Sequence, residues 1–266
     1  MSIEQLKKLP VKDAVYAAMK EHGKPVGANE LVMKTLRDQI EAVRPIQFVG
    51  FWGIGGKDEL DANDYRFIGE LEQMQNQIGQ LYTQGAHIKI ILADMHGVFN
   101  GEVLSRDGKD PKAAAVSRYR RLFNNAHAPY LQNVALALQQ RGIDILWLSD
   151  LYAHQGLEIP NIHEGIDASS QAYEILMEQE QGRHDSYLRS ARHNNRGVPV
   201  EQAAYHYLRE RLQEQPMLVD AFPNHIFFVN GGRNLALRIV PENQLPILYL
   251  REGPVWFQHE GGKGGE

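Results

Sequence analysis

Residues 88–99 read IKIILADMHGVF, and this stretch decides the fold. Its first five residues, IKIIL, are apolar except for one lysine and predict a buried strand, which ends abruptly in the polar turn DMHG at residues 94–97. In open α/β sheets, ligands bind outside the carboxyl ends of the strands. We therefore expect this turn to face a ligand.

Two further stretches have the same character. Residues 46–51 (IQFVGF) lead into the glycine-rich segment WGIGGK at 52–57, and residues 143–148 (IDILWL) lead into Ser149 and Asp150. Helical segments separate the three apolar runs, which is typical of parallel strands in a sheet covered on both faces. We therefore expect the three polar turns to gather at one edge of the sheet.

The two ends of the chain differ from this central part. Apolar residues recur with helical spacing at 11–22 and 28–43, so residues 1–44 are expected to form a helical appendage. This appendage is either a plain structural cap on the sheet or a lid over the site. Near the other end, the turn Asn230-Gly231-Gly232 lies between two β-rich runs and predicts an antiparallel meander that completes the sheet.

A chain of 266 residues is long enough to bury a sizeable core in one α/β domain. The pattern predicts an α/β, Rossmann-like three-layer fold with a mostly parallel sheet, an N-terminal helical appendage and C-terminal antiparallel strands. The catalytic domain is expected at 45–258, followed by a disordered tail at 259–266. Within the domain, Asp61 or Asn63 is expected to cap the helix that follows the glycine-rich segment.

The composition excludes several classes of protein. The 28 basic and 33 acidic residues give a net charge of -5, without the basic excess that nucleic-acid binding requires. There is no cysteine, and the histidines and glutamates at 154–164 show neither HxxxH nor HExxH, so we expect no metal and no cofactor. No apolar run approaches the roughly 18 residues of a membrane span. We expect a cytoplasmic protein without a nucleic-acid or membrane partner.

The glycine-rich segment is too polar to lie in the core. Gly55 and Gly56 would let the backbone approach a ligand closely, and Lys57 would neutralise a phosphate or carboxylate. Both standard phosphate-loop motifs fail at Asp58, where GxxxxGK[ST] needs serine or threonine and GxGxxG needs glycine. An ordinary flexible loop and a ligand-binding loop therefore both remain open.

Asp94 and His96 are the candidates for chemistry in the central turn. A carboxylate at the end of a strand faces the cleft while its neighbours stay buried. The same Asp-x-x-Gly pattern can instead form a hydrogen-bonded turn that leads into a hairpin, and a lone histidine in a turn is often only a turn residue. The residues alone leave a functional and a structural interpretation open.

Two arginine-rich segments have the charge to hold an anion. In the first, Arg118 and Arg121 share a helix face near Tyr119, and in the second, Arg189 and Arg192 share one. A solvated surface is the alternative for each segment.

The central turn resembles the first motif of haloacid-dehalogenase-type phosphatases, in which a strand is followed by Asp-x-Asp-Gly-Val. Asp94, Gly97 and Val98 match this motif, and Ser149 at the end of WLS is similar to the second motif of the family. His96 stands where the family has its acid/base aspartate, and a late acidic pair is missing. This resemblance implies a phosphatase-like transferase with Asp94 as nucleophile and a dependence on magnesium.

A second resemblance covers residues 46–257. The order of a strand, a loop bearing Lys57, a helix rich in glutamate and leucine, and the stretch at 93–99 resembles the isonitrile (isocyanide) synthases of the pyoverdine/dityrosine biosynthesis type. Those proteins have a strand ending in Ser-Asp-Gly-Arg-Val-Phe, for which residues 93–99 stand with one insertion and without the arginine. The helix with Tyr119 and the arginine-rich segment at 183–196 follow in a compatible order.

The second resemblance implies an enzyme of small-molecule secondary metabolism. The implied reaction condenses the α-amine of an amino acid with the ketone of a sugar phosphate such as ribulose 5-phosphate and ends in an isonitrile. Lys57 would be an electrophile or acid/base, Asp94 a general base or amine ligand, and His96 a proton-transfer group. The implied substrate-binding residues are Trp52, Gly55, Gly56, Arg118, Tyr119, Arg189 and Arg192. A non-catalytic protein that binds an amino acid or nucleotide in the same crevice is the remaining alternative.

Overall fold

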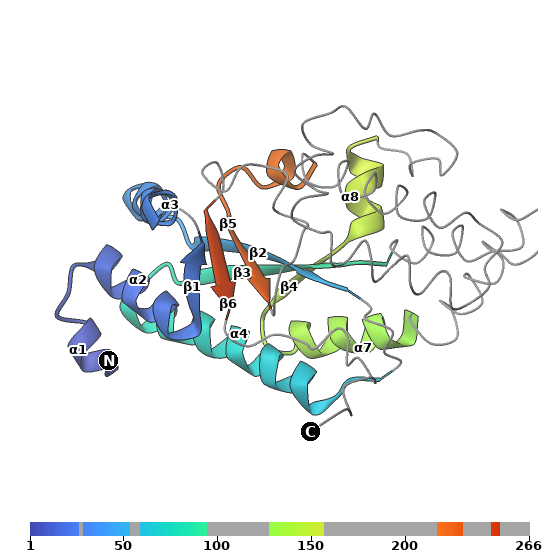
Figure 1. The fold of residues 1–266 in the computed structure, drawn as a ribbon, viewed down its shortest axis with the longest axis horizontal. Coiled ribbons are helices and arrows are strands. Elements are labelled where there is room, and N and C mark those ends of the chain that lie inside the picture. Colours follow the sequence, from blue (N-terminus) through green and yellow to red (C-terminus); the bar gives the residue numbers. More distant parts are fainter. Residues whose placement is uncertain (27–28, 54–58, 95–127, 157–216, 231–245, 251–266) are drawn as a thin grey trace, which may run out of the picture.

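The computed structural model describes residues 1–26, 29–53, 59–94, 128–156, 217–230 and 246–250. Its elements, labelled as in Figure 1, are α1 (Ile3–Leu6), α2 (Val11–His22), β1 (Gly23–Val26), α3 (Asn29–Glu41), β2 (Ile46–Trp52), α4 (Ala62–Leu81), β3 (Ala86–Leu92), α7 (Ala128–Gln139), β4 (Asp144–Trp147), α8 (Leu148–His154), β5 (Ile226–Asn230) and β6 (Ile247–Leu250). None of the helices in these ranges is both long and apolar enough to cross a membrane.

The sheet has six strands in the order β1-β6-β5-β2-β3-β4. Strands β2 to β6 pair in parallel, and β1 alone runs antiparallel, against β6. From β2 the chain moves outward to β3 and β4 and then returns to β5 and β6 on the other side of β2. The expected α/β fold with a mostly parallel sheet is confirmed, and the strand order reverses between β2 and β5.

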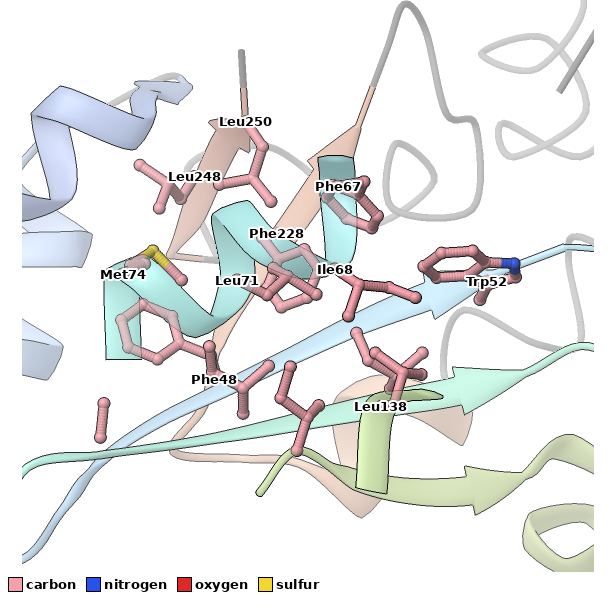
Figure 2. Close-up of a cluster of buried hydrophobic side chains, with 14 of the residues drawn as sticks. Phe48, Trp52, Phe67, Ile68, Leu71, Met74, Leu138, Phe228, Leu248 and Leu250 are labelled. Atoms are coloured by element: carbon pink, nitrogen blue, oxygen red, sulfur yellow. The ribbon is translucent and has the colours of Figure 1, made fainter. Parts of the chain in front are cut away.

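Helices cover both faces of the sheet, which gives three layers. Helices α4 and α7 lie on one face with α2 packed along α4, and α8 lies on the other face beside the helical residues 217–221 (Figure 1). Alternate residues of β2 serve the two faces, because successive side chains of a strand point to opposite sides. Phe48 and Trp52 enter the larger core with α4 and α7 (Figure 2), while Val49 enters the smaller core with α8.

Gly50 lies between Phe48 and Trp52 on the face of the larger core, and the packing at this position requires a glycine. Its register partner on β5 is Phe228, whose ring occupies the space above the glycine. A Cβ atom at Gly50 would lie 2.1 Å from Cε2 of Phe228. The pairing of β2 with β5, at the point where the strand order reverses, therefore depends on the absence of a side chain at this position.

The N-terminal segment contains the two expected helices, and also the short helix α1 and the strand β1, which the sequence did not predict. Gly23 and Pro25, which lie between the two helical runs, belong to β1, and β1 extends the sheet by pairing with β6. Proline is tolerated there because β1 is an edge strand. Val15 of α2 and Leu36 of α3 are fully buried in the larger core. These contacts favour a structural cap over a lid.

The C-terminal strands pair differently from the expected antiparallel meander. β5 and β6 are parallel, with Phe227 opposite Ile247. A two-residue hairpin turn joins only antiparallel strands, whereas a parallel pair needs a connection of about a dozen residues or more. Residues 231–246 provide that length, so β6 is not the partner strand of a turn at Asn230. The run at 235–240 that suggested a hairpin lies outside the described residues.

Candidate functional site

The carboxyl ends of the parallel strands lie at one edge of the sheet, as expected. Leu92 at the end of β3 is level with Trp52 of β2 and with Trp147 of β4. Asp94 and Ser149 each follow their strand by two residues, so both lie just beyond this edge. The strand order also reverses beside β2, which is where ligands bind in folds of this type. This edge, from β2 to β4, is the candidate functional site.

Asp94 and Ser149 are joined by two hydrogen bonds. The backbone N–H of Ser149 donates to Oδ1 of Asp94 at 3.0 Å, and the Ser149 hydroxyl donates to Oδ2 at 2.5 Å. Ser149 was expected in a turn, but it belongs to the first turn of α8, where the side chain of the N-cap residue Trp147 makes no capping hydrogen bond. Asp94 thus caps α8 from the neighbouring strand, because its carboxylate accepts one of the otherwise unpaired N–H groups.

The Asp94 carboxylate retains capacity for a further donor. Ser149 takes two of the about four lone-pair sites that an ionised carboxylate offers. The residue is half-buried, and the two bonds from Ser149 hold its carboxylate in one orientation. A carboxylate of this kind can hold a cationic amine by a charge-assisted hydrogen bond.

A buried polar network lies beneath the same edge. The indole N–H of Trp52 donates to the Tyr130 hydroxyl at 3.1 Å, and that hydroxyl donates to Oδ2 of Asp64 at 3.4 Å. All three side chains are fully buried. Burial raises the pKa of Tyr130 far above its ordinary value of 10.0, and the nearby Asp64 carboxylate raises it further, so the hydroxyl keeps its proton. The network joins β2, α4 and α7.

Helix α4 begins at this edge with a closed capping box. Asp61 is the N-cap and accepts the N–H groups of Asn63 at 2.8 Å and Asp64 at 3.0 Å, while Asp64 accepts the N–H of Asp61 at 3.2 Å. This decides between the two expected caps in favour of Asp61. Two carboxylates at the helix start already match its positive dipole end, which leaves little reason for a phosphate to bind there.

The structure places only two of the predicted site residues. Asp94 is at the edge as expected. Trp52 is fully buried in the larger core, with its ring centroid 5.4 Å from that of Phe67 (Figure 2), so we assign it to support of the edge rather than to contact with a substrate. The other predicted residues lie outside the described ranges; they are Gly55, Gly56, Lys57, His96, Arg118, Tyr119, Arg189 and Arg192.

No metal site is visible among the residues that the structure describes. Within those ranges, no three or more histidines, aspartates or glutamates gather in a group that could hold an ion. His154 ends α8 and is exposed, whereas the other candidates at 158–164 fall outside the described residues. The expected absence of a metal therefore stays a prediction.

The opposite edge contains a titratable pair that the sequence did not suggest. Nε2 of His225, just before β5, lies 3.3 Å from Nζ of Lys89 on β3. Burial and, to a smaller extent, the charge of Lys89 lower the pKa of His225 from 6.5 to about 4. His225 is therefore neutral at physiological pH and accepts a hydrogen bond from the Lys89 ammonium. The pair is at the amino edge, away from the candidate site.

Comparison with known proteins supports the fold. The sequence matches no model of a protein family, and no curated protein matches it. The structure is similar to that of PvcA from Pseudomonas aeruginosa, with a TM-score of 0.50 and 14% identity over 94% of this chain and 86% of that chain. A CDPS from Fluoribacter dumoffii has a TM-score of 0.42 and 14% identity over 79% of this chain and 92% of that one. At these identities the likeness to PvcA concerns the α/β fold.

The sequence held a partial signal for the buried network. Asp61 and Asp64 are spaced as the two ends of a capping box, which marks a helix start beside the candidate edge. Tyr130 carried no such signal, because a tyrosine at an apolar helical position is read as core. Only the packing of α7 against β2 and α4 shows that its hydroxyl is used.

Proposed function

We propose that this chain is a biosynthetic enzyme of secondary metabolism, similar to isonitrile synthases, that joins the α-amine of an amino acid to the ketone of a sugar phosphate such as ribulose 5-phosphate. The observation that carries the proposal is Asp94, a half-buried carboxylate held by Ser149 beyond the end of the central strand. The sequence resemblance to isonitrile synthases supports it. The likeness to PvcA adds that the α/β fold is compatible.

The first step of such a reaction is the formation of an imine. The amine nitrogen bonds to the ketone carbon, and the ketone oxygen leaves as water with the two protons that the nitrogen loses. The step needs an anchored amine, a proton donor for the departing oxygen and a cationic site for the phosphate. We propose His96 and Lys57 for proton transfer, and Arg118, Arg189 and Arg192 for the phosphate or carboxylate.

The geometry of Asp94 favours amine binding over general base catalysis. Hydrogen bonds donated to both oxygens of a carboxylate hold it in one orientation, which suits a group that positions a cationic amine. Ser149 donates two such bonds, one to each oxygen. We therefore assign Asp94 to orienting the substrate amine and leave the proton transfers to other groups.

One observation favours a second candidate, a phosphatase-like transferase. Asp94 and Ser149 match the first two motifs of haloacid-dehalogenase-type phosphatases, and the structure brings them into contact. Ser149 donates one hydrogen bond to each oxygen, which leaves each oxygen of Asp94 a lone pair with which to attack phosphorus. This candidate predicts activity that requires magnesium and releases phosphate.

A ligand panel separates the candidates. The unfolding temperature would be measured with amino acids, sugar phosphates and nucleotides, each with and without magnesium, and mixtures that stabilise the protein would be followed by mass spectrometry. The proposal predicts stabilisation by an aromatic amino acid or a pentose phosphate without magnesium, and a product containing an isonitrile. Stabilisation only with magnesium and a phosphoester would favour the phosphatase-like candidate. Stabilisation without any product would identify a binding protein.

A further inference from the structure

The connection between β2 and α4 has both of its ends bound to one hydroxyl group. Trp52 is the last residue of β2, and its indole N–H donates to the Tyr130 hydroxyl. Asp64 lies in the first turn of α4, and its carboxylate accepts a hydrogen bond from the same hydroxyl. Tyr130, which lies in the first turn of α7, therefore joins the residue before the connection to the helix turn after it.

The first turn of α4 is tied to this hydroxyl by a second contact. Oδ2 of Asp64, which accepts from Tyr130, also accepts the N–H of the N-cap residue Asp61 at 3.2 Å. The side chain of Asp61 in turn fixes the N–H groups of Asn63 and Asp64. A shift of the Tyr130 hydroxyl would therefore disturb both the end of β2 and the start of α4.

Burial gives these bonds their strength. Trp52, Tyr130 and Asp64 are each fully buried, so water cannot replace a lost partner. A phenylalanine ring would fill the same volume but would leave the Trp52 N–H and the Asp64 carboxylate without this partner. The polar network instead specifies one relative position of β2 and α4, at the edge where the candidate site lies.

We infer that Tyr130 is a positioning residue, whose hydroxyl sets the relative position of the end of β2 and the start of α4, and thereby that of Asp94, because the Trp52 carbonyl accepts the N–H of Ala93 at 2.9 Å. The expected effect of Tyr130 on catalysis rests on the proposed function, whereas its effect on the positions of the end of β2 and the start of α4 does not. Tyr130 is not expected to touch a substrate, because its side chain is fully buried.

The test uses Tyr130→Phe, which removes the hydroxyl and keeps the ring, and Tyr82→Phe as a matched control. Tyr82 is the C-cap residue of α4, and its hydroxyl donates to the Arg44 carbonyl at 3.0 Å. Amide hydrogen exchange would be followed by mass spectrometry along α4. Tyr130→Phe is expected to raise exchange at residues 61–66 by about tenfold or more, the factor that a lost buried hydrogen bond gives, and to leave residues 70–81 unchanged.

Two exchange results would overturn the inference. One is unchanged exchange at residues 61–66 in Tyr130→Phe. The other is an equal increase along the whole of α4, because that would show a general loss of stability. Tyr82→Phe is expected to leave residues 61–66 at the wild-type rate.

A kinetic measurement tests the link to function. With L-tyrosine and ribulose 5-phosphate as the substrate pair, Tyr130→Phe is expected to lower kcat by about tenfold to a hundredfold, since a misplaced catalytic group costs rate even when binding is kept. Ile78→Val, a buried change in the distant half of α4, is the control for lost stability and should keep kcat. An unchanged kcat in Tyr130→Phe would contradict the positioning role. No turnover by the wild type with any pair would contradict the proposed function, and the exchange result would then decide the inference alone.

Discussion

The two edges of the parallel sheet use their polar side chains in different ways. At the amino edge, Gln39 of α3 accepts the N–H of Gln47 at 2.9 Å and donates to the carbonyl of Asn224, so one amide joins α3, β2 and the residues before β5. At the carboxyl edge, the half-buried Asp94 accepts two hydrogen bonds from Ser149 and keeps capacity for another donor.

The difference suggests a division of roles, in which the amino edge stabilises the fold and the carboxyl edge is the candidate for ligand binding. Side chains at the amino edge bind backbone groups of the chain itself and hold the elements together. The carboxyl edge combines the half-buried Asp94 carboxylate with the buried network of Trp52, Tyr130 and Asp64. This division is expected for open α/β sheets, in which ligands bind beyond the carboxyl ends of the strands. The following changes test how far the two edges are independent.

The largest effect is expected from Gly50→Ala, which would damage the sheet that both edges share. The new Cβ would lie 2.1 Å from Cε2 of Phe228, so the pairing of β2 with β5 would have to shift. We expect the free energy of unfolding, measured in urea, to fall by about 3 kcal/mol or more, the upper end for overpacked cores. Gly69→Ala in α4 is the control, because nothing lies within 4 Å of its Cβ position, and it should be neutral or stabilising. Equal stability of the two variants would contradict this packing.

A smaller effect, confined to the amino edge, is expected from Gln39→Ala. The change leaves the Gln47 N–H and the Asn224 carbonyl without the partner that they share. The free energy of unfolding should fall by about 1–3 kcal/mol, while the unfolding-temperature shift that a ligand produces should stay as in the wild type. Gln75→Ala removes an exposed amide hydrogen bond to the Gly142 carbonyl and should have little effect. If the ligand no longer raised the unfolding temperature of Gln39→Ala, the two edges would not be independent.

The central fold could be predicted from the sequence because its strands are marked by local patterns. The apolar runs that form β2 and β3 end in polar residues, and this pattern placed Asp94 at the carboxyl edge correctly. The strand β1 could not be predicted, because GKPV with Gly23 and Pro25 has no strand signal of its own and is extended only by pairing with β6. The parallel pairing of β5 with β6 could not be predicted either, because a turn at Asn230 does not indicate which strand pairs with β5.

The candidate site was predictable only where a polar residue follows a strand. Asp94 met that condition. Ser149 also met it, although it lies in the first turn of α8 and not in a loop. The contact between them depends on the register of β3 and β4, which no local pattern gives. Tyr130 and Asp64 lie 66 residues apart and meet at the end of β2 only because α4 and α7 cover the same face.

A change at the carboxyl edge tests whether Ser149 orients Asp94 for ligand binding. Ser149→Ala removes the hydroxyl that donates to Oδ2 of Asp94 and keeps the backbone N–H that donates to Oδ1. The affinity for an amino acid found in the ligand panel, measured by titration calorimetry, should fall by about tenfold, because hydrogen bonds to a charged group are the stronger kind. Ser149→Thr keeps a hydroxyl and should restore most of the affinity. If both variants bind like the wild type, Ser149 does not orient Asp94.

The smallest expected effect is the contribution of His225, at the amino edge, to the pH dependence of stability. The pKa of His225 falls from 6.5 to about 4 on folding, so between these values the unfolded chain binds a proton that the folded chain does not. Stability should therefore decrease as the pH falls through this window. The loss of stability between about pH 7 and about pH 5 should be smaller in His225→Gln than in the wild type, as measured by urea unfolding at both pH values. Equal losses would show that His225 is not held neutral by the fold.

The most direct test of the central claim compares Asp94→Asn with Asp150→Asn. Asp150 is exposed in the first turn of α8 beside the same edge, so both variants lose one negative charge there, but only Asp94 is held by Ser149. The unfolding temperature would be measured for each variant and the wild type with and without the amino acid that stabilises the wild type. The account predicts that Asp150→Asn responds like the wild type and that Asp94→Asn loses the response while remaining folded. An equal response in all three proteins would contradict the assignment of Asp94 to the substrate amine.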